Sequence, residues 1–575
     1  MIWSWARKSV LGFAVTLAAS IPAFARQADL VITGGTIRTM DASQPVVDSI
    51  AIIGNEIVAT GSAAKIGELV NVQTKIIRLE PGQIAIPGLI ESHGHFLGLG
   101  ESLMMLDLAG AKKWDDIVEQ VREASETAPP GSWIIGRGWH QSKWSEAPAG
   151  SIGGYPDSRG LDMAAPNNPV LLTHASGHMS IANGYAMRLS GMDTNSQPPA
   201  GGELLRREDG ELSGVLRETA QGMVQRALAQ DSAKMTAEES MAKLERAVQL
   251  AGEECWKNGI TSFHDAGSSV SSTRQLQRMA MQHRLPVRLY VMVRDSPEMI
   301  RERISLVKSI GLGDEFFTCR SLKRSIDGAL GPHGAWLLAP YADLTGSSGL
   351  NTDSVEVVRQ TAELAAENGL QMCVHAIGDR ANREVLDMYE ELINKKTLRG
   401  DHRWRIEHAQ HVHPDDIKRF GELGVIAAMQ GVHCTSDAIF VLQRLGALRA
   451  EQGAYVWRSL LDSGAVICNG TDVPVERIDP IASITACVTR RLADGATFFP
   501  EQCMTREETL RSYTIDAAWA AFDETRKGSL VPGKLADITI LSRDIIDCSD
   551  DDLPKTKVVQ TIIGGKVVFE DKDGG

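Results

Sequence analysis

One short pattern recurs along the middle of the chain: an amphipathic helix, then a glycine, then an apolar strand. In its clearest copy, residues 355–368 carry apolar side chains at helical spacing, Gly369 follows, and residues 370–374 form an apolar run. The same order returns at 247–263, 415–429 and 459–468. Such repeats predict βα units around a parallel sheet. Their number favours an α/β fold with a closed, TIM-like (β/α)8 barrel over an open sheet.

Both ends of the chain look different from this repeat. Residues 26–86 and 526–575 contain short apolar strands separated by Gly and Asn, which is typical of hairpins. Neither end has enough strands for a stable sheet, so we expect the two to build one small β-sandwich. The barrel would then occupy residues 87–525.

A stretch at about 100–240 does not follow the repeat. It is rich in proline and glycine at 198–202 and carries four tryptophans: Trp114, Trp133, Trp139 and Trp144. We expect an insertion at the barrel mouth. Because barrel active sites lie at the C-terminal ends of the strands, such an insertion would shape a substrate pocket.

Residues 1–25 resemble an export signal. Arg7 and Lys8 precede an uncharged apolar run at 10–19, and residues 23–25 are Ala-Phe-Ala, a sequence that a signal peptidase accepts. The run is too short to cross a bilayer comfortably, although an uncleaved anchor is the alternative. We predict an exported protein with no stable membrane insertion after cleavage, periplasmic if the source is Gram-negative and secreted otherwise.

The net charge and the cysteines indicate which partners and which covalent cross-links to expect. The formal charge is −14, which argues against a nucleic-acid partner because neutralising phosphates needs a basic surface. The eight cysteines contain no C-x-x-C pair. In a chain this long they are typical of buried apolar positions, with one or two disulfides left open if the compartment is oxidising.

The strongest local motif is His93-Gly94-His95, which follows an apolar stretch. Side chains two residues apart on a strand point the same way, so two imidazoles at this spacing can bind one metal ion. Alone, the motif is more often a pair of surface histidines.

Four further strand ends carry side chains that metal sites use: Lys323, His375, His408 and Asp472. Each alone has an ordinary structural explanation, such as a packed histidine, a solvated lysine or a helix-capping aspartate. In a barrel these ends meet at one mouth, so residues distant in sequence can share an ion. The separate explanations do not account for the joint order H-x-H, Lys, His, His, Asp.

With this order the chain resembles the amidohydrolase superfamily, specifically the family 3 branch of YtcJ-like and N-substituted formamide deformylase-like proteins. The motifs that carry the resemblance lie at 87–95, 136–139, 177–178, 327–331, 375–381, 405–410 and 470–472, with a matching C-terminal stretch at 527–537. Three departures stand out, since the family usually has Asp where Glu91 and His140 stand and Ser-Arg where Pro332-His333 stands.

The resemblance implies a ligand set. His93 and His95 would bind the more buried metal, and His375 and His408 the second. Lys323 would be N-carboxylated and bridge the two ions, while Asp472 would bind a metal and move protons. The cofactor is a divalent metal, one or two ions per chain, and Zn²⁺ suits the nitrogen-rich set best. Without carboxylation of Lys323, the site would hold one ion.

Four residues are candidate substrate contacts. Trp139 and His178 belong to the motifs of the insertion, His264 ends a strand, and His433 follows another strand end, where it could polarise a carbonyl. Each has a structural alternative as a packed or hydrogen-bonded side chain. His411 and His413, which fall in a loop before Pro414, are not expected to be ligands.

These residues predict a metal-dependent hydrolase that cleaves an amide-type C–N bond, other than a peptide bond, with a metal-activated hydroxide. Asp472 is the catalytic residue that accepts and delivers the proton. The same site could open an ester or lactone. A serine hydrolase is disfavoured because no G-x-S-x-G motif is present, and a non-catalytic exported barrel that binds a ligand stays open. The partner is a small-molecule substrate, and a homo-oligomer is not excluded.

Overall fold

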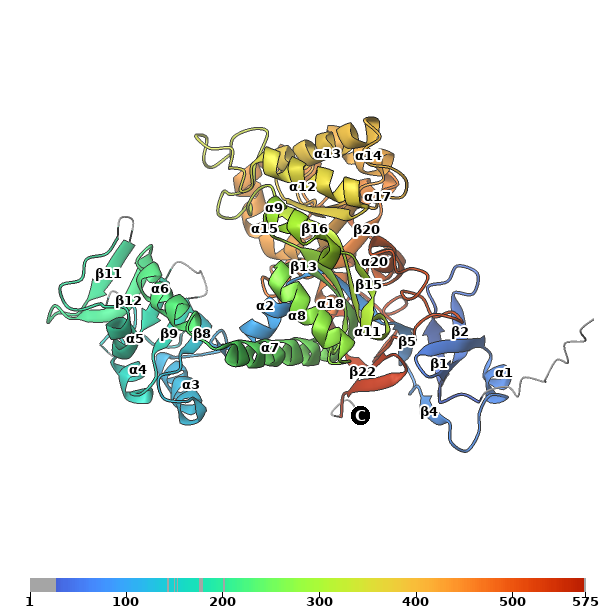
Figure 1. Ribbon diagram of the computed structural model, residues 1–575, viewed down its shortest axis with the longest axis horizontal. Coiled ribbons are helices and arrows are strands. Elements are labelled where there is room, and N and C mark those ends of the chain that lie inside the picture. Colours follow the sequence, from blue (N-terminus) through green and yellow to red (C-terminus); the bar gives the residue numbers. More distant parts are fainter. Residues whose placement is uncertain are drawn as a thin grey trace, which may run out of the picture.

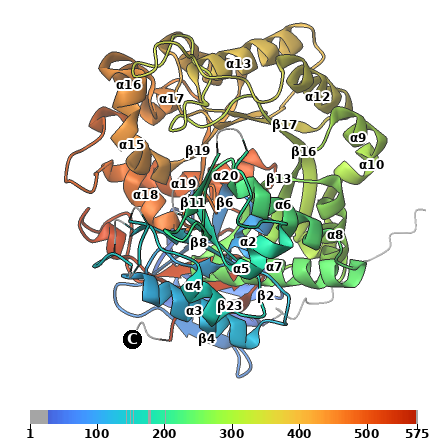
Figure 2. The ribbon, with the colours of Figure 1, turned by 90° about the vertical axis from the view of Figure 1, so that its left-hand side faces the viewer.

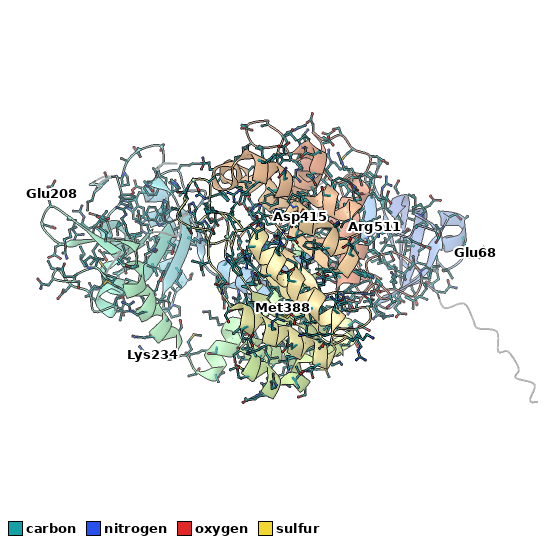
Figure 3. The ribbon with its side chains drawn as sticks, turned by 90° about the horizontal axis from the view of Figure 1, so that it is seen from above. Glu68, Glu208, Lys234, Met388, Asp415 and Arg511 are labelled. Carbon is teal, nitrogen blue, oxygen red and sulfur yellow. The ribbon has the colours of Figure 1, made fainter. Side chains whose placement is uncertain are left out.

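Three sheets follow one another along the long axis of the molecule (Figure 1). The computed structural model describes residues 27–572 except 142–143, 149, 153, 175–178 and 200–201, so the predicted export signal lies outside the described residues. Seen from above, Glu68, beside the terminal sheet, and Glu208, in a turn of the inserted lobe, lie at opposite ends, with Met388 and Asp415 of the barrel helices between them (Figure 3).

The central sheet is a nearly closed barrel of eight parallel strands. In order around the barrel they are β6 (Leu89–Gly94), β13 (Ile260–Ser268), β14 (Arg288–Val293), β16 (Phe317–Ser325), β17 (Gln371–Ala376), β18 (Arg405–His408), β19 (Ile426–Gln430) and β20 (Ile467–Gly470). The short β15 (Ser309–Gly311) pairs with β16 at its edge. The end of β20 returns to β6, where the Asp472 amide donates to the His93 carbonyl over 2.8 Å. The predicted (β/α)8 barrel is confirmed.

Helices surround the strands in a ring (Figure 2). They are α7 (Ala237–Lys257), α8 (Val270–Met281), α9 (Pro297–Glu302), α10 (Ile304–Val307), α11 (Leu312–Glu315), α12 (Val355–Asn368), α13 (Asp379–Asn394), α14 (Pro414–Leu423), α15 (Gly431–Leu445), α16 (Ala447–Gly453), α17 (Trp457–Asp462), α18 (Pro480–Thr489), α19 (Arg506–Ser512) and α20 (Ile515–Ala520), with short 3₁₀ turns η2 (Pro500–Gln502) and η3 (Leu553–Lys555). The largest apolar core lies between this ring and the strands.

The predicted helix stops explain the regular alternation. At the start of α12 the Ser354 hydroxyl accepts the Val357 amide over 3.3 Å, and the helix ends at Gly369 with φ 61°. Gly424 ends α14 in the same way, with φ 65°. This left-handed conformation suits glycine because it has no Cβ, so each helix stops where the next strand must begin.

Strands from both chain ends share one eight-stranded sheet. Its members are β1 (Leu30–Arg38), β2 (Val46–Ile53), β3 (Glu56–Gly61), β4 (Lys75–Arg78), β5 (Ile84–Pro87), β21 (Ile538–Leu541), β22 (Val558–Ile563) and β23 (Lys566–Glu570), with helix α1 (Ala63–Gly67) beside them. The two ends join where β5 pairs antiparallel with β21. The strands are hydrogen-bonded into one continuous sheet, and the predicted union of the two ends is confirmed.

The insertion is a separate lobe between α2 (Phe96–Ser102) and α7. Its sheet contains β7 (Leu106–Asp107), β8 (Ile134–Trp139), β9 (Val170–His174), β10 (Met179–Ala182), β11 (Gly202–Arg206) and β12 (Leu212–Glu218), and its helices are α3 (Trp114–Thr127), α4 (Arg159–Ala164), α5 (Gly184–Leu189) and α6 (Gln221–Ser232). The lobe has its own apolar core.

The position of the lobe follows from the direction of the strands. Because β5 of the terminal sheet runs directly into β6, the N-terminal ends of the barrel strands face that sheet. Their C-terminal ends therefore point to the opposite side, where the insertion lies (Figures 1 and 2). Among the described residues, no helix has the length and apolar composition that crossing a bilayer requires.

A buried ion pair joins the terminal sheet to the barrel. The Arg288 guanidinium donates from Nε to one Asp537 oxygen over 2.7 Å and from Nη2 to the other over 3.0 Å, and both side chains are buried. We expect Arg288→Met to lower the free energy of unfolding by about 3–5 kcal/mol, because it leaves the Asp537 carboxylate buried without its cation.

The second half of this test is the double variant. Adding Asp537→Leu to Arg288→Met removes the stranded charge and is expected to restore part of the loss, measured by denaturant unfolding. Equal stability of the single and the double variant would contradict this account.

Candidate metal centre

The predicted histidines and Asp472 meet at the C-terminal ends of the barrel strands. The His93 ring centroid lies 4.7 Å from that of His408, which in turn lies 4.4 Å from that of His375. Asp472 Oδ1 lies 3.5 Å from His93 Nε2 and 3.3 Å from His95 Nε2. The barrel therefore brings five of the predicted residues together from four strand ends.

The donor atoms form two groups. His93, His95 and Asp472 each offer one donor atom, and these atoms all lie within 4.8 Å of one another. His408, His433 and Asp472 make a second group, whose donor atoms also lie within 4.8 Å of one another. The Asp472 carboxylate belongs to both, so it lies at the centre of the site.

Hydrogen bonds on the outer side determine which ring nitrogen faces inward. His93 Nδ1 contacts the Glu407 carboxylate, and His408 Nδ1 contacts Gln430 Oε1 over 2.6 Å. The amide of Gln430 donates to the Ala428 carbonyl over 3.2 Å, which leaves its oxygen toward His408. Both imidazoles therefore carry their proton on Nδ1, and the lone pair of Nε2 faces the site.

The Nε2 lone pair of His93 thus faces the Asp472 carboxylate, and other buried polar atoms of the site lack partners as well. His93 Nε2, His375 Nε2, His433 Nε2 and Asp472 Oδ1 are all buried without a hydrogen-bond partner among the described residues. Buried polar atoms without partners are costly, and a nitrogen lone pair 3.5 Å from a carboxylate oxygen is repulsive. A divalent cation removes both costs, and imidazole nitrogen with carboxylate oxygen is a donor set that zinc prefers.

The electrostatics favour the ligating forms. Burial, followed by the charge of Lys323, lowers the pKa of His93 to about 4 and that of His375 to about 3, so both imidazoles are neutral near pH 7. Burial alone would raise the pKa of Asp472. The nearby imidazoles, first that of His95 and then those of His93 and His408, outweigh burial and hold that pKa well below its usual range.

The backbone at two of these residues is uncommon. His408 has φ 75° and Asp472 has φ 59°, in the left-handed region that side chains other than glycine rarely adopt. Such strained positions gather at functional sites, where the surrounding structure holds them in place.

The comparisons with known proteins agree with this geometry. The profile described as "Amidohydrolase family" matches residues 81–569. The chain belongs to the amidohydrolase family. It is 33% identical to Protein LONG AFTER FAR-RED 3 of Arabidopsis thaliana, over 96% of this chain and 94% of that protein. It is 27% identical to N-substituted formamide deformylase of Arthrobacter pascens, over 94% and 98%.

A solved structure supports the same assignment. An uncharacterized metal-dependent hydrolase from Pyrococcus furiosus superposes with a TM-score of 0.72 at 27% identity, over 90% of this chain and all of that one. The resemblance found in the sequence is confirmed, and this amidohydrolase is a metal-dependent hydrolase.

Lys323 of the amidohydrolase lies beside the two donor groups without belonging to either. It is buried on β16, and its Nζ donates to the Ala266 carbonyl over 3.3 Å. Burial lowers the pKa of its ammonium group, and the charges of Glu407 and Asp472 oppose that shift.

The candidate substrate contacts are dispersed. His178 lies outside the described residues. Trp139 is fully buried in the core of the insertion, where its Nε1 donates to the Leu172 carbonyl over 3.0 Å. His264 is fully buried too, and its Nδ1 accepts from Arg405 over 3.2 Å. Of the three that the structure describes, only His433 lies within a donor group.

The residues that support the donor side chains, Glu407 and Arg405, were not predicted from the sequence. Glu407 is fully buried between His93 and Arg405, with 2.7 Å between Arg405 Nε and Glu407 Oε1. Arg405 also donates to the Ser92 carbonyl over 2.8 Å. The strand alternation contained a hint, because Arg405 and Glu407 lie two residues apart on β18 and share a face.

A second support joins β6 to β20. The buried Glu91 carboxylate accepts from the Thr471 amide over 2.6 Å and from its hydroxyl over 3.2 Å. Burial raises the pKa of Glu91 to about 8, although both of these hydrogen bonds favour the ionised form. A Cβ on Gly470 would lie 2.3 Å from Glu91 Oε1, so only glycine fits beside this carboxylate. The contact fixes the residue that precedes Asp472.

Glu407 allows a test of the outer side of the site. We expect Glu407→Gln to weaken Zn²⁺ binding by roughly 10–100-fold, because the anion that orients the His93 ring is lost. The measurement is competition with a chromogenic chelator. The exposed Glu367→Gln on α12 serves as control, and unchanged affinity in Glu407→Gln would contradict the prediction.

Proposed function

We propose that this amidohydrolase cleaves an amide-type C–N bond, other than a peptide bond, in a small molecule. The observation that carries the proposal is the cluster of buried acceptors around Asp472, which needs a cation at the mouth of a barrel. The name of the relative N-substituted formamide deformylase supports the C–N bond as the target. Esters and lactones react through the same steps and are the alternative substrates.

The proposed cofactor is Zn²⁺, held by His93, His95 and Asp472. Bound there, it would supply the positive charge that lowers the pKa of a water molecule and polarises a carbonyl. N-carboxylation of Lys323 is part of the same proposal. Carbon dioxide reacts with a neutral amine, and burial of Lys323 favours that neutral form.

Asp472 is proposed to move the proton. Its carboxylate is ionised at neutral pH because its pKa is held low, so it can accept the proton of the attacking water. The same group then delivers the proton to the leaving nitrogen. His95, whose side chain is 35% exposed, is the most exposed of these three proposed ligands.

The test is an activity panel of N-substituted formamides, other amides, esters and lactones. We expect removal of metal by a chelator to abolish turnover, and Zn²⁺ to restore it. Asp472→Asn should lower kcat by about 10²–10⁴-fold, since the proton acceptor is lost. The exposed Asp415→Asn on α14 is the matched control. Full activity after metal removal, or in Asp472→Asn, would rule out this mechanism.

We also propose export, which rests on the sequence of residues 1–25. In a Gram-negative host, the expected product is a periplasmic chain shortened by 25 residues, and deletion of 2–25 should keep it in the cytoplasm. Fractionation with intact-mass analysis measures both. A full-length chain bound to membranes would show an uncleaved anchor instead.

A further inference from the structure

The second donor group contains a histidine that the family resemblance does not assign to a metal. We propose that His433 is a ligand of a second divalent cation, together with His408 and Asp472. This inference rests on the proposed function, since both cations share the Asp472 carboxylate. It replaces the role of a carbonyl-polarising substrate contact that the sequence suggested for His433.

The fold holds His433 rigidly at this place. It lies in the first turn of α15, directly after the end of β19. The Gly431 amide donates to Asn469 Oδ1 over 3.1 Å, and a Cβ on Gly431 would lie 2.5 Å from Cys487 Sγ. The turn is therefore packed tightly against α18 and the end of β20, so His433 is presented to the site by close packing.

The His433 side chain has the burial expected of a ligand. It is only 8% exposed, and its Nε2 is buried with no hydrogen-bond partner among the described residues. Buried polar atoms are normally paired, and an imidazole with its proton on Nδ1 offers at Nε2 a lone pair that can bind a cation. The neighbours of this nitrogen within the donor group are the acceptors of His408 and Asp472.

The two imidazoles of the group are matched in orientation. The rings of His408 and His433 lie nearly parallel, with an angle of 8° and centroids 6.2 Å apart. Gln430 accepts from His408 Nδ1 and ends the strand from which α15 begins, so one strand end orients both rings. Two imidazoles and one carboxylate leave further coordination positions open for water and substrate, as catalytic zinc sites do.

The experiment counts the metal ions bound. The metal-free full chain is titrated with Zn²⁺ by calorimetry, and metal content is measured after gel filtration. Wild type is expected to bind two equivalents and His433→Ala one. The control His411→Ala removes another buried histidine, whose Nε2 faces Gln410 outside both donor groups, and should keep two equivalents. The equivalent retained in His433→Ala shows that the variant is folded.

Two results would overturn the inference and leave the proposed function intact. One is a wild-type protein with a single equivalent whose removal abolishes activity. The other is His433→Ala with two equivalents and a raised KM, which would make His433 a substrate contact. A wild-type protein that binds no metal would remove the proposed function as well.

Discussion

The structure of this amidohydrolase depends on one buried carboxylate that faces lone pairs. Asp472 Oδ1 lies within 3.5 Å of the Nε2 atoms of both His93 and His95, and His408 and His433 approach the same residue. Without a positive charge between them, the buried lone pairs and the carboxylate repel one another. The barrel, its loops and its buried hydrogen bonds hold them in place nevertheless, which is the physical basis for assigning a cation to this site.

The side chains that hold the donor residues in place are themselves polar and buried. Glu407 and Arg405 form a fully buried pair beneath His93, and Glu91 joins the end of β6 to the residue before Asp472. The first pair places two charges where solvation is lost, which the fold tolerates because each charge is the partner of the other. The left-handed backbone at His408 and Asp472 adds local strain at the same points. The buried charges and the strained backbone both cost folding free energy, and both position the donor residues.

Much of the barrel fold and of the candidate site could be predicted because strand and helix periodicity are local properties of the sequence. The apolar faces and glycine stops indicated the barrel, and the ends of its strands contained the histidines and Asp472. Other features were not local. Trp139 and His264 resembled pocket residues by position, yet the structure places both in buried cores, because burial depends on what packs against a strand from elsewhere in the chain. Glu407 was visible in the motif, but its contact with His93 spans 314 residues.

The sequence by itself determined the alternation of helices and strands and the barrel class, since both follow from short-range spacing. Its motifs also indicated the family, and that resemblance implied most of the candidate donor residues. Only the tertiary structure decided how those donors divide into two groups, that His433 belongs to one of them and that Lys323 and His375 belong to neither. The physical reason is that coordination depends on distances of a few ångströms between side chains from different strands. Those distances arise only when β20 closes against β6 and the strand ends meet.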